Sequence, residues 1–152
     1  IGFPALASTS MAQGRIAACH AFGKRIHSLT NFFPYGIYSV PEISTCGNTE
    51  DQLIQNNVLY VKGIAQFKET SRGQIMGMNN GFLKLLFNKK NKKLLGVHII
   101  GEGASELIHI GQAVIQLNGS IDYFIENIFN FPTLAESYKV AALNAWNKIE
   151  KY

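Results

Sequence analysis

The sequence predicts an α+β fold, in which an antiparallel sheet has helices packed on one face. Three observations support this prediction. A helical segment opens the chain, strand-like segments cluster between residues 36 and 100 around one small helix, and helical segments fill the remainder. Strands grouped in one part of a sequence and helices in another are typical of an α+β layer.

The opening helix is expected within residues 3–26. Pro4 suits a first helical turn, where its missing N–H costs nothing, and Gly23 indicates the end of the helix. The segment 28–36 contains proline, glycine and aromatic residues, so it predicts a break in regular structure.

Strand-like residues follow on both sides of Pro41, at 36–40 and 42–47. A proline inside such a segment indicates an edge strand or a bend. Thr49 and Gln52 have the spacing of a capping box, which predicts a short helix that ends at the next pair of asparagines.

The second half of the chain shows clearer periodicity. Two segments rich in aliphatic and aromatic residues flank a polar, lysine-rich tip, which predicts a hairpin. After the hairpin, apolar residues recur at helical spacing, which predicts helices. The expected elements are a strand at 58–67, a hairpin at 81–100, a helix at 104–119, a short helix at 121–129 with Ser120 as its N-cap, and a last helix after Thr133.

The composition indicates a packed globular chain. Of its 152 residues, 47% are hydrophobic and 16% are charged, which argues against disorder. The net charge is +4, and the one dense basic cluster is the lysine group within residues 89–93. No aromatic residues alternate with these lysines, so they are interpreted as a solvated turn, and no nucleic-acid partner is expected.

The sequence points to a cytoplasmic protein without membrane association. It has no signal peptide and no apolar run of transmembrane length. Cys19 and Cys46 have neither metal-ligand nor Cys-x-x-Cys spacing, so two reduced thiols are favoured over one disulfide. The chain begins at Ile1 and not at methionine, so we expect it to be part of a longer protein.

The segment "GEGASE", residues 101–106, follows a predicted strand and opens a predicted helix. Glycines in this position can form a dinucleotide-binding loop, because they let the backbone approach a pyrophosphate at a helix N-terminus. Glu106 stands where a third glycine would be needed, and its carboxylate would repel a phosphate. A plain strand-to-helix turn is therefore favoured.

The sequence shows no residue spacing that predicts a metal site or a group of catalytic residues. Glu106 and His109 have the spacing of a carboxylate-bridged metal site, but such sites need a second copy of the motif. His20, His27 and His98 have no ligand at metal spacing. Neither cysteine lies near an activating base, so no catalytic residue and no metal are expected in this chain.

The turn "FNFPTLAES", residues 129–137, leads into the last predicted helix. Phe131 and Pro132 form an aromatic entrance to the helix, and Thr133 with Glu136 has the spacing of another capping box. We favour a capping role for Glu136 over a catalytic one.

Three stretches in this order resemble the pyridine nucleotide–disulfide oxidoreductase family. The segment "FPALASTSMAQGRIAA" is similar to the end of its flavin-binding domain. "YGIYSVPEISTCGNTEDQL" resembles the start of its C-terminal dimerisation domain, and "FPTLAES" resembles its terminal His-Pro-Thr motif. The resemblance implies that residues 1–30 are a flavin-domain remnant and that residues 31–152 form a dimerisation domain.

Phe131 selects a branch of the family. In the disulfide-reducing members, the residue before this proline is the histidine that serves as acid/base, and a phenyl ring cannot transfer protons. The segments 65–87, 95–113 and 129–144 resemble the soluble pyridine nucleotide transhydrogenase branch. That resemblance implies hydride transfer between NADPH and NAD⁺ through FAD. The alternatives are the interface domain of a disulfide reductase similar to dihydrolipoamide dehydrogenase and a non-enzymatic interaction module.

The resemblance implies few site residues. Leu6 and Ala7 would direct backbone N–H groups at the flavin, and Phe131 would offer its backbone carbonyl to the FAD of the other subunit. It further implies a homo-oligomer, at least a dimer, with NAD(H) and NADP(H) as substrates of the longer protein. The helices expected at 106–117 and 135–146 are the candidate interface, and the chain alone is expected to lack FAD and activity.

Overall fold

The computed structural model describes residues 2–25, 29 and 31–149, and the chain divides into two compact units, 1–33 and 34–152. The first unit contains the helix α1 (Ala7–Ala21). Gly23 has a left-handed φ of +62° just after the C-cap, which confirms the expected end of this helix. No helix in the described part of the chain is long and apolar enough to cross a membrane.

The position predicted for Pro4 was wrong. It precedes α1 by three residues, and its carbonyl accepts hydrogen bonds from the Leu6 N–H and from the Thr9 Oγ1. These bonds form a separate turn, so the helix begins only after Leu6. Residue 26, the last of the segment within which the helix was expected, lies outside the described residues.

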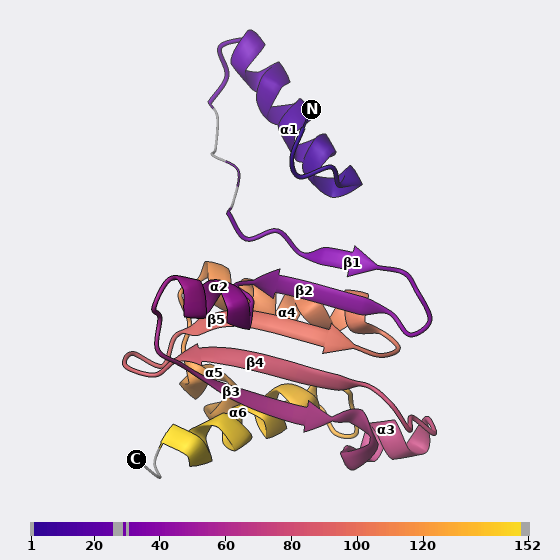
Figure 1. Ribbon diagram of the computed structural model, residues 1–152. Coiled ribbons are helices and arrows are strands. Elements are labelled where there is room, and N and C mark those ends of the chain that lie inside the picture. The colour runs from indigo at the N-terminus through magenta and orange to yellow at the C-terminus, as the bar shows by residue number, and fades with distance from the viewer. Residues whose placement is uncertain (1, 26–28, 30, 150–152) are drawn as a thin grey trace. The chain divides into compact units, whose positions relative to one another are not determined.

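The second unit is built on a five-stranded antiparallel sheet with the order β1-β2-β5-β4-β3 (Figure 1). Each strand pairs with its neighbours in an antiparallel register, as the sequence predicted. The strands are β1 (Tyr35–Ile37), β2 (Ile43–Gly47), β3 (Tyr60–Gln66), β4 (Phe82–Asn88) and β5 (Leu94–Ile100).

Three helices cover one face of the sheet: α4 (Ala104–Gln116), α5 (Ile121–Glu126) and α6 (Glu136–Ile149) (Figure 1). Gly63, Leu85 and Val97 pair in register across β3, β4 and β5, so they share this face. The Gly63 backbone lies directly against the Ala141 carbonyl of α6. The predicted fold class is confirmed.

The short helix α2 (Glu50–Gln55) lies over the face of the sheet opposite to α4, α5 and α6 (Figure 1). Its predicted capping box is confirmed: Thr49 and Gln52 exchange side-chain-to-backbone hydrogen bonds of 3.2 and 2.9 Å. The predicted N-cap Ser120 is also confirmed, since its Oγ accepts the Asp122 N–H.

One region was not predicted from the sequence. A 3₁₀ turn (Phe67–Glu69) leads into α3 (Ser71–Ile75) between β3 and β4. Thr70 caps this helix by accepting the Gly73 N–H at 3.1 Å. Thr70 could have indicated a helix N-cap in the sequence, but the five residues of α3 are too few to show a helical period.

Tyr138 holds the helical layer together. It is fully buried, and its ring stacks on Phe124 with centroids 5.2 Å apart. Its hydroxyl donates to the Leu107 carbonyl at 2.7 Å and accepts the Gly111 N–H at 3.1 Å. One side chain of α6 therefore satisfies two backbone groups of α4, and burial raises the pKa of this phenol, which stays protonated.

Candidate functional site

The turn between α5 and α6 is exposed and apolar. Ile128 is 96% exposed and Phe131 is 69% exposed. The Thr133 Oγ1 donates to the Asn130 carbonyl at 2.6 Å, which closes the turn. Within the described residues the Phe131 carbonyl accepts no hydrogen bond, so it is open to a partner from outside.

The capping box predicted for Thr133 and Glu136 was wrong. Glu136 is itself the first residue of α6, so Thr133 lies too far before the helix to serve as its N-cap. The Thr133 hydroxyl is a donor in the turn and does not accept the Glu136 N–H. The Glu136 Oε2 is buried and has no hydrogen-bond partner in the described part of the chain, and the same holds for the Ser137 Oγ.

The start of α1 is the second place that the resemblance marked. Leu6 is its N-cap residue and provides no side-chain cap, and the first intrahelical bond runs from the Ser10 N–H to the Leu6 carbonyl. The N–H groups of Ala7 and Ser8 have no acceptor among the described residues. An uncapped helix start attracts negative charge. Leu6 and Ala7 belong to the first unit and Phe131 to the second, so the structure describes two separate places.

The glycine loop before α4 is not an anion site. The Glu42 Oε2 accepts hydrogen bonds from the Ser105 backbone N–H at 3.1 Å and from its Oγ at 2.8 Å. A carboxylate from the chain thus occupies the position that a phosphate would need. The structure agrees with a plain strand-to-helix turn, and the role of Glu42, which follows Pro41, was not anticipated.

His98, His109 and Cys46 have structural environments. His109 pairs through Nδ1 with the Gln112 Oε1 at 2.9 Å, and the His98 Nε2 lies 3.0 Å from the Asn48 carbonyl oxygen. Burial lowers the pKa of His98 and raises the pKa of Cys46 to about 11, so that thiol is a poor nucleophile. Among the described residues no three His, Cys, Asp or Glu side chains are grouped to hold a metal, and His27 lies outside them.

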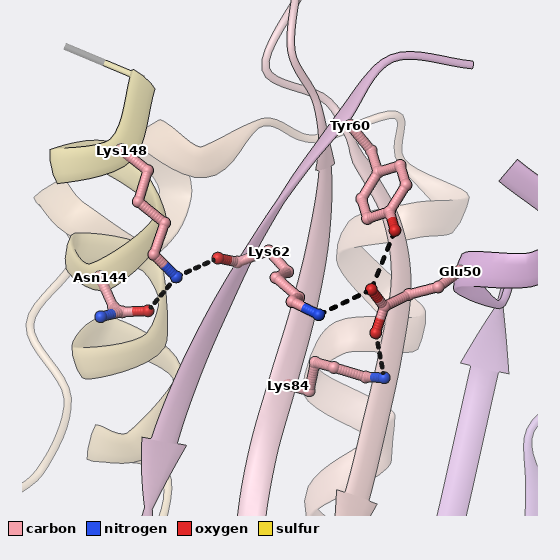
Figure 2. A network of polar contacts seen from close by, with 6 residues as sticks. All are labelled: Glu50, Tyr60, Lys62, Lys84, Asn144 and Lys148. Carbon is pink, nitrogen blue, oxygen red and sulfur yellow. Dashed lines mark hydrogen bonds and ion pairs between the residues drawn. The ribbon is translucent and has the colours of Figure 1, made fainter. Parts of the chain in front are cut away.

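A cluster of polar side chains surrounds Glu50 on the sheet face that carries α2 (Figure 2). Its carboxylate accepts hydrogen bonds from the Lys84 Nζ at 2.7 Å, the Lys62 Nζ at 3.0 Å and the Tyr60 hydroxyl at 2.9 Å. All three donors belong to β3 and β4, so the cluster fastens the first turn of α2 to the sheet. Its groups satisfy one another, which indicates a structural role.

The same cluster predicts a loss of stability in acid. The hydrogen bond from Lys84, together with those from Lys62 and Tyr60, lowers the pKa of Glu50 to about 2. A carboxylate whose folded pKa is depressed stabilises the fold above its unfolded pKa of about 4.3, and this contribution is lost as the pH falls towards 2. We expect it to be on the order of 1–2 kcal/mol, because solvent screens the half-exposed Lys62.

The measurement is the free energy of unfolding in urea at pH 6 and near pH 2.5, for the wild type and for Glu50→Gln. The wild type should lose more stability than the variant between the two pH values, because only the wild type has this carboxylate to protonate. Equal losses would show that the Glu50 cluster contributes nothing to the acid response.

The free edge of the sheet is also closed by α6. The Ile64 N–H donates to the Asn144 Oδ1 at 3.1 Å. The Lys148 Nζ donates to the Lys62 carbonyl at 2.8 Å (Figure 2). Two side chains of one helix thereby occupy backbone groups of the edge strand β3, which would otherwise be open to pairing with another strand.

The lysine-rich hairpin tip is mostly solvated, as expected. Lys90 and Lys93 are exposed. Lys92 is an exception, because its Nζ lies 3.9 Å from the centre of the Trp146 ring of α6 in a cation–π contact. The sequence separates these two residues by 54 positions, so the contact could not be seen in it.

The comparisons with known proteins agree with this architecture. Residues 33–142 match the family described as the pyridine nucleotide–disulphide oxidoreductase dimerisation domain. The chain belongs to this family. The dimerisation-domain match covers the whole sheet and most of the helical layer, which confirms the resemblance of the two sequence stretches that lie within it.

Relatives with the same domain are soluble pyridine nucleotide transhydrogenases. The protein from Mycobacterium bovis (strain BCG / Pasteur 1173P2) is 52% identical over 149 residues, which are 98% of this chain and 32% of that protein. The protein from Escherichia coli O1:K1 / APEC is 50% identical over 153 residues, which are 98% of this chain and 33% of that protein. The chain therefore spans about a third of the length of these relatives.

Two solved structures share the dimerisation-domain fold. LpdA from Mycobacterium tuberculosis superimposes with a TM-score of 0.84 at 24% identity, over 93% of this chain and 31% of that one. The HOCl-induced flavoprotein disulfide reductase RclA from Escherichia coli gives a TM-score of 0.84 at 21% identity, over 91% of this chain and 32% of that one. At this identity the likeness concerns the fold alone.

Proposed function

We propose that the chain is the dimerisation domain, with the last helix of a flavin-binding domain, of a homo-oligomeric cytoplasmic flavoprotein that transfers a hydride between NADPH and NAD⁺. The observation that carries this proposal is the 50–52% identity to soluble pyridine nucleotide transhydrogenases over 98% of the chain. The free thiols of Cys19 and Cys46 support a reducing compartment.

The boundary between the two domains is proposed at about residue 30. The division of the chain into compact units at residues 33 and 34 supports it, and so does the family match that begins at residue 33. Residues 1–30 are then the flavin-domain part and residues 31–152 the dimerisation domain.

The residues proposed to meet FAD are Leu6, Ala7 and Phe131. The Leu6 N–H already donates to the Pro4 carbonyl, so at the start of α1 the uncapped N–H group of Ala7 is the one that suits the electron-rich, carbonyl-bearing end of a flavin ring, because a helix start stabilises negative charge. In a dimer, the free Phe131 carbonyl is a suitable acceptor for a flavin N–H of the other subunit. When bound, FAD relays the hydride from one nicotinamide nucleotide to the other.

Phe131 leaves the turn without a side-chain acid/base, and the proposed reaction does not need one. A hydride relay requires no proton donor at the turn, so a phenyl ring is compatible with it, whereas reduction of a disulfide requires an acid/base. The turn positions the Phe131 backbone, and the exposed ring extends the apolar surface at which the second subunit is proposed to sit.

The experiment uses the longer protein that contains this chain. It should purify with bound FAD, and it should reduce a thionicotinamide analogue of NAD⁺ at the expense of NADPH without any disulfide substrate. Phe131→Leu should change kcat/KM by less than about tenfold, because the proposed contact is made by the backbone, whereas removal of a side-chain acid/base typically costs about 10²–10⁴-fold.

NADPH-dependent disulfide reduction without hydride transfer to the analogue would instead favour the disulfide-reductase alternative. Absence of flavin and of both activities in that longer protein would favour a non-enzymatic module.

A further inference from the structure

Two asparagines of the chain are followed directly by glycine, at Asn80–Gly81 and at Asn118–Gly119. In such a pair the glycine backbone nitrogen can attack the side-chain amide carbon of the asparagine, because a glycine has no Cβ to hinder the approach. The attack requires that the backbone N–H of the glycine is free. Both asparagines are exposed, so the hydrogen bonds of the two glycines distinguish the pairs.

The backbone N–H of Gly119 is occupied. It donates to the Val114 carbonyl at 2.8 Å, just after the end of α4. The nitrogen would have to give up this bond before it could attack Asn118. The fold therefore protects the second pair, although its asparagine side chain is open to water.

The backbone N–H of Gly81 is free within the described part of the chain. Gly81 lies immediately before β4, and its carbonyl accepts the Phe67 N–H at 3.0 Å, whereas its own N–H donates to none of the described residues. The side-chain amide of Asn80 likewise has no hydrogen-bond partner among those residues. Both reacting groups of the first pair are thus unoccupied.

Asn80 lines a pocket of about 390 Å³ where the loop before β2, the loop before β4 and the turn before α4 meet. Glu42 and Glu102 line the same pocket, and no lysine, arginine or histidine is among the residues described as lining it. A new carboxylate at position 80 would therefore join two others without a cation to pair with.

We propose that Asn80 is a site of spontaneous deamidation, which adds a third carboxylate to this pocket. The Gly81 nitrogen forms a bond to the Asn80 Cγ, and the bond from Cγ to Nδ2 breaks. The amide nitrogen leaves as ammonia and takes the Gly81 proton with it. Water then opens the succinimide ring and gives aspartate or isoaspartate, so water is the one further reactant.

The test compares the two pairs within one sample. The complete chain is incubated at mildly alkaline pH, both folded and unfolded in guanidinium chloride, and deamidation of each peptide is followed by mass spectrometry. Each folded rate is divided by the unfolded rate of the same pair, which removes the effect of neighbouring residues. This ratio should be about tenfold or more higher for Asn80 than for Asn118, because only Gly119 must first lose a hydrogen bond.

Two matched variants assign the reaction to its residue. Asn80→Gln should remove the fast phase of ammonia release from the folded chain, since a glutamine must close a larger ring, whereas Asn118→Gln should leave that phase unchanged. Equal rate ratios for the two pairs, or a higher ratio for Asn118, would overturn the proposal. So would a fast phase that persists in Asn80→Gln.

Discussion

Replacing Gly63 with alanine is expected to destabilise the second unit by about 3 kcal/mol or more, because the added methyl group has no space. A Cβ at this position would overlap the Ala141 carbonyl of α6 and would come within 2.9 Å of the Ala145 Cβ. Because the atom that the added Cβ would overlap belongs to the backbone, a side-chain rotation cannot remove the overlap. The helix α6 would have to move away from β3. The urea midpoint of unfolding should fall sharply.

Gly36→Ala is the control for Gly63→Ala, since Gly36 is also a strand glycine. A Cβ there would meet only the Tyr38 side chain, at 3.4 Å, on the edge strand β1. Its effect should stay within about 0.5 kcal/mol, as for most surface substitutions. Similar losses for the two variants would mean that the close approach of α6 to β3 contributes little to stability.

Tyr138→Ala should cost about 3–5 kcal/mol, as large-to-small changes of buried aromatic residues do. The stacked contact with Phe124 would be lost, and the Gly111 N–H and Leu107 carbonyl would lose their shared partner. The free energy of unfolding in urea measures this effect.

Tyr138→Phe separates the two parts of the Tyr138 contribution. It keeps the ring and removes only the hydroxyl, so the expected loss is about 1–3 kcal/mol. A phenylalanine variant as stable as the wild type would show that α4 closes its own hydrogen bonds without the tyrosine, and the link between α4 and α6 would then rest on the apolar contact alone.

The sequence was sufficient for local structure where one short motif determines the geometry. The Thr49 capping box, the Ser120 cap and the hairpin around the lysine tip were all correct, because each depends on neighbours within a few residues. The motif at Thr133 has the same spacing as a capping box, yet it does not form one. The turn with Asn130 competes for the hydroxyl, and the spacing alone cannot rank the two bonds.

Contacts between distant segments were not accessible from the sequence. Glu42 caps α4 across 63 residues, and the side chains of Asn144 and Lys148 reach the β3 edge across 80 and 86 residues. These contacts depend on which elements the tertiary fold brings together. In contrast, the replacement of a family histidine by Phe131 is readable from sequence, because it is an identity at one position and not a geometry.

The central claim is that the turn before α6 is where a second copy sits. Sedimentation equilibrium of the complete chain, as wild type and as Ile128→Asp, tests it most directly. Ile54→Asp is the control, because Ile54 is also exposed, at 61%, but lies on α2 over the opposite face of the sheet. We predict a dimer for the wild type and for Ile54→Asp, and a monomer for Ile128→Asp. A dimer that persists in Ile128→Asp and dissociates in Ile54→Asp would contradict the claim.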